Sequence, residues 1–247
     1  MWNNPPATLS LGSDEVHVWR ASLHLEASRL ESLLPTLAED ERARAARFYF
    51  PKDRDHFVAG RGILRALLAR YLGAHPADLR FRYSPKGKPA LVPEFDAGAL
   101  RFNVSHSHGL ALYAVTRGHD LGVDVERIQP RLEERIAERF FSPREVAALQ
   151  TLPPPLQHEA FFACWTRKEA YIKATGEGLS LGLDQFAVSL VPGEPAALLW
   201  TEGDPQEARR WCLHALDPGP GYAAAICVGG HDWRLACWQW TEEAGSP

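Results

Sequence analysis

The hydrophobic pattern of this chain switches repeatedly between the periods of strands and of helices, and this restricts its fold more than any other feature. Apolar and polar residues alternate in the run 16–20, as they do in half-buried strands, and strand-like segments recur at 100–104, 111–116 and 121–125. Residues 38–72 are instead rich in Ala, Leu, Arg and Glu, with apolar residues near helical spacing. A chain that mixes the two periods in this way belongs to the α+β class.

The same mixture returns in the second part of the chain. Ser142 and Glu145 form a capping box with Pro143 at the first helical position, which predicts a helix over 143–149. A longer helix is predicted over 157–174, and we expect the three prolines at 153–155 to separate the two. Five short strand-like runs then follow between residues 186 and 240.

An internal similarity suggests how the domains are organised. The hexamer at 47–52, RFYFPK, and the hexamer at 139–144, RFFSPR, share three identical and two conservative positions. A chance match between two amphipathic stretches is the alternative, because a single short repeat is weak evidence. We expect two related halves, residues 1–117 and 118–240, followed by a flexible tail at 241–247.

Charge and cysteine content exclude several classes of protein. The 247 residues carry 27 Lys plus Arg and 31 Asp plus Glu, a formal net charge of −4, which argues against a nucleic-acid partner. We find no signal-peptide pattern and no run of about 18 apolar residues, so we expect no membrane span. The four cysteines are too few for a disulfide scaffold. We expect a cytoplasmic protein without membrane partners.

Two acids in the run LGVDVE are the first candidate for chemistry. Asp124 and Glu126 project from one face of the predicted strand, because side chains alternate with period two. Neighbouring carboxylates repel unless a cation or a proton lies between them, so the pair is a candidate site for a hard divalent metal. The alternative is a solvated strand face carrying two surface acids.

A second cluster lies on the predicted helix 157–174. Glu169 and Lys173 are four residues apart and share one helical face. They are either an exposed ion pair or, together with Asp124 and Glu126, part of a site in which three acids and a lysine hold Mg²⁺ and a diphosphate.

Further polar groups lie on loops and strand ends. Ser105 and His106 end a strand and are suited either to a turn or to hydrogen bonding a phosphate. Lys86 and Lys88 flank a glycine in a loop that is either a solvated hairpin tip or a phosphate or purine site. The chain contains no G-x-S-x-G elbow and no H-E-x-x-H helix, so hydrolase motifs are lacking.

The ordered motifs SPKGKPAL, FNVSHS, LGVDVERI, RFFSPREVAAL and FFACWTRKEAYIKATGEGLSLGLDQFAV resemble the 4'-phosphopantetheinyl transferase superfamily. The resemblance is to its larger type, which activates peptide and polyketide synthetases, and covers residues 44–188. It implies two pseudo-symmetric α/β halves with the active site between them. It also implies transfer of phosphopantetheine from coenzyme A to a serine of an apo acyl or peptidyl carrier protein, with release of adenosine 3',5'-bisphosphate.

The resemblance also implies roles for individual residues. Metal ligands for Mg²⁺, or Mn²⁺, would be Asp124, Glu126 and Glu169; Lys173 would contact the diphosphate, and Glu169 or a metal-bound water would take the serine proton. Coenzyme A would be bound through Arg44, Arg61, Lys86, Lys88, Ser105, His106 and Lys173. We expect a monomer.

Two positions depart from the family pattern. Glu41 is acidic where a basic residue is expected, and His56 replaces an arginine. These departures affect the contacts to the 3'-phosphate and leave the acids untouched. Two other functions are alternatives: a Mg²⁺-dependent phosphohydrolase, which would share the acids, and a non-catalytic module that binds coenzyme A.

Overall fold

The computed structural model describes residues 2–95, 100–129 and 134–241, so all but the first residue of the expected flexible tail lies outside it. The first part of the chain contains β1 (Glu15–Ser22), α1 (Ala27–Leu33), α2 (Glu39–Ala45), α3 (Pro51–Leu72), β2 (Phe81–Tyr83), β3 (Pro89–Leu91), β4 (Leu100–Ser107) and β5 (Leu110–Arg117). The second contains β6 (Leu121–Arg127), α4 (Glu134–Phe140), α5 (Pro143–Thr151), α6 (Pro154–Thr175), β7 (Phe186–Val188), β8 (Leu198–Thr201), β9 (Trp211–Leu216) and β10 (Tyr222–Gly229). A last strand, β11 (Arg234–Gln239), follows.

The order of elements repeats. Each part runs from one strand through three helices, the third of 22 residues, to a two-stranded hairpin and then two more strands. In the first part β5 pairs antiparallel with β1 and β4, and in the second part β10 pairs antiparallel with β6 and β9. The α+β fold therefore consists of two halves with the same topology.

The similar hexamers do not occupy matching places in this repeat. Residues 47–52 lead into α3, the long helix of the first half, whereas residues 139–144 lead into α5, which precedes the long helix α6. In both cases the shared proline, Pro51 or Pro143, begins a helix. The hexamers mark two helix starts, and the element order shows the repeat more clearly than they do.

One strand crosses between the halves. β11, which follows all the elements of the second repeat, pairs in parallel with β1, so that the first sheet has the order β11-β1-β5-β4. The second sheet has the order β6-β10-β9. The end of the chain therefore ties the second half to the first.

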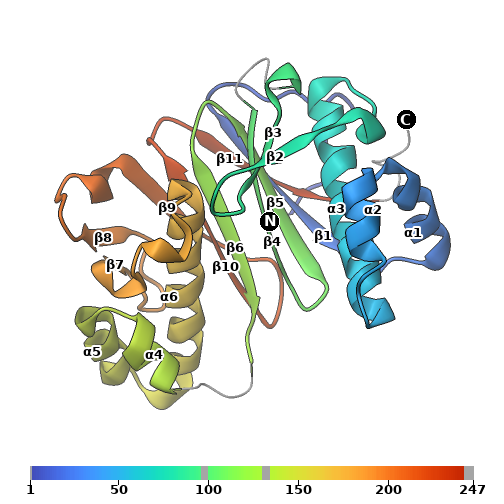
Figure 1. Cartoon of the computed structure of the whole chain (residues 1–247). Coiled ribbons are helices and arrows are strands. Elements are labelled where there is room, and N and C mark those ends of the chain that lie inside the picture. Colours follow the sequence, from blue (N-terminus) through green and yellow to red (C-terminus); the bar gives the residue numbers. More distant parts are fainter. Residues whose placement is uncertain (1, 96–99, 130–133, 242–247) are drawn as a thin grey trace.

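The core forms three apolar layers. Figure 1 shows α3 and α6 on opposite sides of the strands. One cluster packs α3 on the first sheet, a second packs α4, α5 and α6 on the second sheet, and a third lies between the two sheets. The middle cluster includes Val18 and Leu112 from the first sheet and Val123, Val125 and Ile226 from the second. Since Val123 and Val125 face this middle layer, the alternate residues of β6 face α6.

Most predicted elements are confirmed, with differences at the boundaries. The predicted helical stretch 38–72 divides into α2 and α3, and Gly73 ends α3 in a left-handed conformation. α5 ends before the triple proline, and Pro154 and Pro155 form the first turn of α6, where their missing N–H groups cost nothing.

The four cysteines are unpaired. Among the residues described, no helix is long and apolar enough to cross a membrane.

Candidate active site

The candidate site lies where edge strand β4 of the first sheet meets edge strand β6 of the second. Side chains of alternate β4 residues accept the backbone N–H groups of alternate β6 residues. The bonds run from the nitrogens of Val123, Val125 and Arg127 to side-chain oxygens of Asn103, Ser105 and Ser107, at 2.9, 3.3 and 3.1 Å. This row of polar side chains fixes the register between the two strands and thereby the positions of the acids on β6.

Asp124 is the most buried acid of the site, with 2 % of its surface exposed. Its Oδ1 atom accepts hydrogen bonds from the Ser105 hydroxyl at 2.8 Å and from the Lys173 ammonium at 2.6 Å. Its Oδ2 atom is buried and has no hydrogen-bond partner. A buried carboxylate oxygen without a partner is costly, so this atom has an unused capacity to bind a cation or a donor.

Glu126 lies two residues further along the same face of β6. Its Oε2 atom accepts a hydrogen bond from the Ser107 hydroxyl at 2.8 Å. Burial, and then the charge of Asp124, raise the pKa of the Glu126 carboxyl, although the Ser107 hydrogen bond and Lys173 oppose them.

Gly122 brings α6 against this strand. A Cβ atom at Gly122 would lie 2.2 Å from the carbonyl oxygen of Ala170 and 2.3 Å from the nitrogen of Ala174, so only glycine allows this approach. The close approach brings Glu169 and Lys173 of α6 to the acids of β6. Burial, followed by the charge of Asp124, raises the pKa of Glu169; Lys173 opposes the shift and Glu126 adds to it.

These groups line one open pocket of about 390 Å³. Its walls are Val104, Ser105, His106, Asp124, Glu126, Trp165, Glu169 and Lys173. The pocket thus brings together the three predicted metal ligands, the predicted diphosphate lysine, and two predicted nucleotide contacts. The pKa of His106 is lowered by burial and then by the nearby charge of Lys173.

The donor set suits a hard divalent cation. All three acids offer oxygen ligands, and Asp124 has a free buried oxygen. The charge of Asp124 adds to burial in raising the pKa of both Glu126 and Glu169, and a bound cation would oppose that shift. In the part of the chain that is described, no three His, Cys, Asp or Glu side chains form a ready-made metal cage. The residues fit the ion chemically, and Oδ1 of Asp124 is bonded to Lys173.

The basic loop spans the two halves. The Lys88 ammonium donates to the carbonyl oxygens of Leu121 at 3.1 Å and of Lys173 at 2.5 Å, and the Lys86 ammonium contacts the Ser180 hydroxyl. Burial lowers the pKa of Lys88. Lys88 therefore caps the carboxyl end of α6 through the backbone of Lys173. Its predicted role toward a nucleotide stays a prediction.

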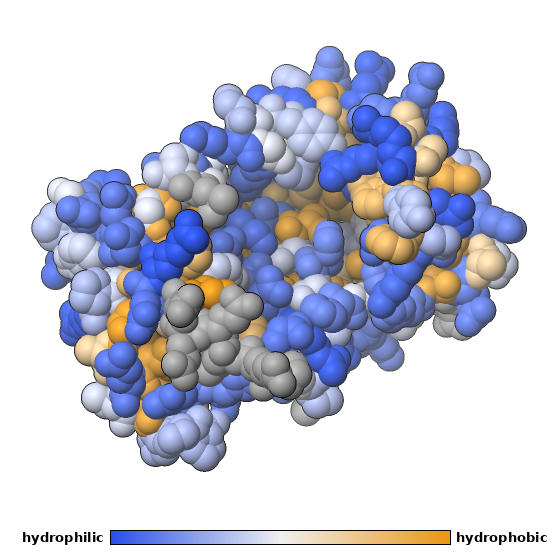
Figure 2. Space-filling view, turned by 60° about the horizontal axis from the view of Figure 1, so that its bottom comes forward, coloured by the Kyte–Doolittle hydropathy of each residue, from blue (hydrophilic) through white to orange (hydrophobic). Residues whose placement is uncertain are grey.

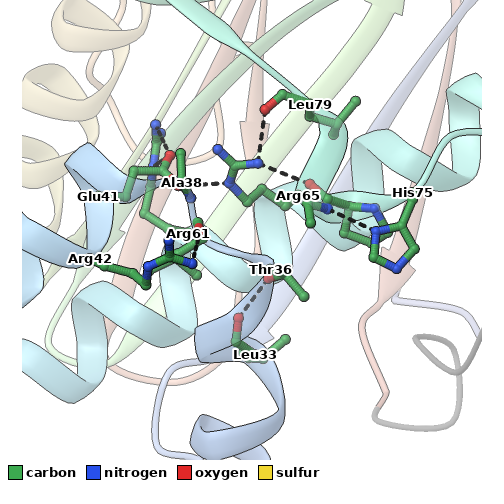
Figure 3. A network of polar contacts seen from close by, with 12 residues as sticks. Leu33, Thr36, Ala38, Glu41, Arg42, Arg61, Arg65, His75 and Leu79 are labelled. Carbon is green, nitrogen blue, oxygen red and sulfur yellow. Dashed lines mark hydrogen bonds and ion pairs between the residues drawn. The ribbon is translucent and has the colours of Figure 1, made fainter.

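The departure at Glu41 has a structural explanation. Figure 3 shows Glu41 of α2 beside Arg61 and Arg65 of α3. Its Oε1 atom accepts from Arg61 at 2.8 Å and its Oε2 atom from Arg65 at 2.7 Å. Although burial raises the pKa of Glu41, the bond from Arg65 and the charge of Arg61 hold it below the ordinary value. Glu41 is a buried anchor between two helices.

The other basic candidates have neighbours of their own. Arg61 also donates to the hydroxyl of Tyr83 at 2.6 Å. Arg44 is exposed on α2, with its guanidinium 5.2 Å from the centre of the Phe57 ring. His56, the second departure, lies with its Nε2 atom 3.3 Å from Nδ1 of His24. The structure keeps these groups outside the pocket of the acids, and their predicted contacts with coenzyme A stay predictions.

A buried ion pair that no sequence pattern indicated lies beside the site. Lys168 is fully buried, and its ammonium lies 2.7 Å from Oε2 of Glu145 and 2.7 Å from the carbonyl oxygen of Phe186. The other carboxylate oxygen of Glu145 accepts the N–H of Val188 at 2.8 Å. Lys168 thus anchors α6 to α5 and β7, while the next residue, Glu169, faces the pocket.

Two further hollows follow the pocket in succession. One of about 240 Å³ shares Glu169 and Lys173 with it and is bordered by Lys86 and Lys88. A larger hollow, of about 520 Å³, shares Lys88 with this smaller one. Figure 2 shows the surface hollowed between two lobes, with hydrophilic and hydrophobic residues around the hollow. The 240 Å³ hollow therefore lies between the pocket of the acids and the larger hollow, since it shares lining residues with both.

Comparisons with known proteins point to one family. Residues 120–227 match the family model described as the 4'-phosphopantetheinyl transferase superfamily, and residues 19–117 match the model described as 4'-phosphopantetheinyl transferase, N-terminal. The two matches fall on the two halves of the repeat.

Curated relatives extend the similarity to nearly the whole chain. The chain is 44 % identical to the 4'-phosphopantetheinyl transferase HetI of Nostoc sp. over 240 residues. This match covers 97 % of this chain and 98 % of that protein. It is 30 % identical to the 4'-phosphopantetheinyl transferase Sfp of Bacillus subtilis over 204 residues, 82 % of this chain and 87 % of that protein.

Proposed function

Because the chain belongs to the 4'-phosphopantetheinyl transferase superfamily, we propose that it transfers 4'-phosphopantetheine from coenzyme A to a serine of an apo acyl or peptidyl carrier protein. The observation that carries the proposal is the grouping of three acids and Lys173 around one pocket, with a buried Asp124 oxygen left unpartnered. Such a group is suited to a diphosphate and a divalent cation, since phosphoryl transfer depends mainly on positioning and charge neutralisation.

The reaction exchanges a phosphoanhydride bond for a phosphoester bond. The serine oxygen of the carrier forms a bond to the β-phosphorus of coenzyme A, and the bond from that phosphorus to the bridging diphosphate oxygen breaks. Adenosine 3',5'-bisphosphate leaves, and the serine proton passes to a base. Glu169 is the candidate base in this chain, because its pKa is raised toward neutral pH, where a general base is most effective.

Asp124, Glu126 and Glu169 would hold Mg²⁺, with Mn²⁺ as a substitute. When bound, the ion supplies positive charge to the diphosphate oxygens. Lys173 supplies a second positive charge. Its ammonium, which is bonded to Asp124, would also contact the diphosphate. Ser105 keeps Asp124 oriented by its hydrogen bond to Oδ1.

The nucleotide end of coenzyme A would occupy the adjoining hollows bordered by Lys86 and Lys88. His106 lines the acid pocket and is a candidate contact for the 3'-phosphate. Arg44 and Arg61 lie further out, on the two helices that Glu41 joins, and would contact the same end of the ligand.

The two halves of the chain would divide the work of the site. We assign residues 1–117 to nucleotide contacts and residues 118–240 to the metal site and catalytic helix, with β11 returning to the first sheet. The protein would act as a cytoplasmic monomer whose macromolecular partner is the carrier, with no role for nucleic acid or membranes.

Intact-mass spectrometry of a carrier tests this function. Apo carrier, coenzyme A and Mg²⁺ should together give a carrier heavier by one phosphopantetheine, and EDTA should abolish the gain. Coenzyme A hydrolysis at turnover rates without any carrier would favour a phosphohydrolase instead. Tight coenzyme A binding that persists in EDTA, with no mass gain across a panel of carriers, would favour a binding module.

A further inference from the structure

We propose that His108, acting through Ser107, is a positioning residue for the proposed metal ligand Glu126. His108 follows β4 at the tight turn to β5, outside the pocket of the acids. Its Nδ1 atom lies 3.2 Å from the Ser107 hydroxyl, which lies 2.8 Å from Oε2 of Glu126. The inference rests on the proposed function, because it concerns how a metal ligand is held.

Counting donors and acceptors gives this chain of hydrogen bonds a direction. The Ser107 oxygen accepts the backbone N–H of Arg127 at 3.1 Å, and its single proton is available to one acceptor. If Nδ1 of His108 were unprotonated, it would compete with Glu126 for that proton. With the proton on Nδ1, the imidazole donates to Ser107, and the hydroxyl must donate to Glu126.

Gln129 selects this form of the imidazole. Its side-chain nitrogen lies 3.2 Å from Nε2 of His108 and 3.4 Å from the carbonyl oxygen of Arg127. An amide nitrogen can only donate, so Nε2 of a neutral His108 accepts and Nδ1 carries the proton. The chain Gln129 to His108 to Ser107 to Glu126 is then satisfied at every step.

Hydrogen bonds to its backbone hold the turn that carries His108. Its φ of 47° lies in the left-handed region and is the one positive φ found at a non-glycine among the residues described. The next residue, Gly109, also has a positive φ, and its carbonyl oxygen accepts the N–H of Leu23 at 2.7 Å. The Tyr222 hydroxyl donates to the carbonyl oxygen of His108 at 3.2 Å.

The cost of that conformation separates a functional from a structural role. Glycine is favoured over histidine at a positive φ, so a residue retained only for folding would be better replaced by glycine. Histidine tolerates a positive φ better than most non-glycine residues, and here its ring contacts Ser107, which donates to Glu126. Groups that orient a metal ligand through a hydrogen bond commonly change metal affinity when they are removed.

The test titrates Mn²⁺ into the full-length protein with coenzyme A present, using calorimetry, and measures thermal unfolding without metal. His108→Gly should weaken Mn²⁺ binding about 10-fold, within the range typical for such partners. Its metal-free unfolding temperature should stay equal to or exceed that of the wild type, because the strain at φ 47° is relieved. His108→Asn should recover part of the affinity, since asparagine tolerates this backbone and can donate to Ser107.

A matched control separates loss of a hydroxyl from loss of metal positioning. Ser107→Ala should lower both stability and Mn²⁺ affinity. Thr116→Val, which removes another buried hydroxyl and its 2.8 Å bond to the Glu15 carbonyl, should lower stability alone.

Two results would overturn the inference while leaving the proposed function standing. One is a Mn²⁺ affinity of His108→Gly within twofold of the wild type. The other is a loss of affinity matched by a loss of metal-free stability, which would indicate a structural role. Wild-type protein that binds no Mn²⁺ would instead remove the proposed metal site and this inference with it.

Discussion

The ammonium of Lys173 lies 2.6 Å from the Oδ1 atom of Asp124, joining the long helix of the second half to its first strand. The lysine side chain is 28 % exposed and that of the aspartate 3 %. The lysine therefore neutralises a carboxylate that is otherwise out of reach of water, while its own outer side remains open to a ligand. A group in this position is suited to act both as a structural counter-ion and as a diphosphate contact.

Replacing Lys173 by methionine should affect stability as well as activity. Asp124 would keep only the Ser105 donor, and a buried charged acceptor that loses a partner costs about 1–3 kcal/mol. Chemical denaturation should show this loss. The Lys173→Met, Asp124→Asn double variant should regain part of it, because the stranded charge is gone, and purely additive losses would contradict the coupling.

Glu169→Gln should be inactive and yet more stable than the wild type in the absence of metal. Loss of a general base typically lowers the rate about 100-fold to 10,000-fold. The pKa of Glu169 is raised in the folded protein, so its stabilising contribution is present at low pH and is lost as pH rises through that pKa. The gain in unfolding temperature should therefore be visible at pH 8 and vanish in acid. A variant that is less stable than the wild type at pH 8 would contradict this.

The protection that Mg²⁺ gives against thermal unfolding should weaken as pH falls. Metal ligands must be deprotonated, and the pKa values of Glu126 and Glu169 are both raised. Protons should therefore compete with the ion at a higher pH than for ordinary glutamates. Unfolding temperatures with and without Mg²⁺, measured across pH 5 to 8, provide the check, and a shift independent of pH would argue against these ligands.

Gly122→Ala should separate α6 from β6. The added Cβ meets backbone atoms that have no side-chain freedom, and overpacking of this kind costs about 1–3 kcal/mol. Transfer should fall with it, because Glu169 and Lys173 move with the helix. Gly60→Ala, in α3, is the matched control. Its Cβ would have its nearest neighbours, Leu23 and Tyr113, at 3.9 and 4.0 Å, and the variant should keep full activity.

Lys168→Met should destabilise the second half without touching the pocket. It would strand Glu145 as a buried charge, and breaking such a pair costs about 3–5 kcal/mol. Equilibrium unfolding measures the loss, and activity at low temperature should persist. A variant with wild-type stability would show that Glu145 finds another partner.

Local pattern was enough to predict most elements and the position of the acids. Period-two alternation predicts that Asp124 and Glu126 share a face of β6, and helical spacing predicts that Glu169 and Lys173 share a face of α6. The capping box of Ser142 and Glu145 is also confirmed. Each of these predictions depends on residues close together in the chain.

Contacts between distant segments could not be predicted in this way. Alternation in β4 shows that Asn103, Ser105 and Ser107 share a face, but it does not show that they receive the N–H groups of β6. The parallel pairing of β11 with β1 joins segments more than 200 residues apart, and no local signal specifies it.

Single residues in familiar motifs also took unexpected positions. Glu41 reads as a lost basic contact until its two arginine partners are seen, and Lys88 reads as a phosphate ligand although its ammonium caps a helix. The observed partners of both residues come from other elements of the fold, and the predicted role of Lys88 toward a nucleotide stays a prediction.

The most direct test of the account is single-turnover transfer to an apo carrier, followed by intact mass while Mg²⁺ is varied. Wild-type protein should add one phosphopantetheine per carrier only when Mg²⁺ is present. Asp124→Asn and Glu169→Gln, folded by circular dichroism, should add none on the same timescale. Transfer at the wild-type rate by both variants, or by the wild type in EDTA, would contradict the assignment of these acids to the metal and the reaction.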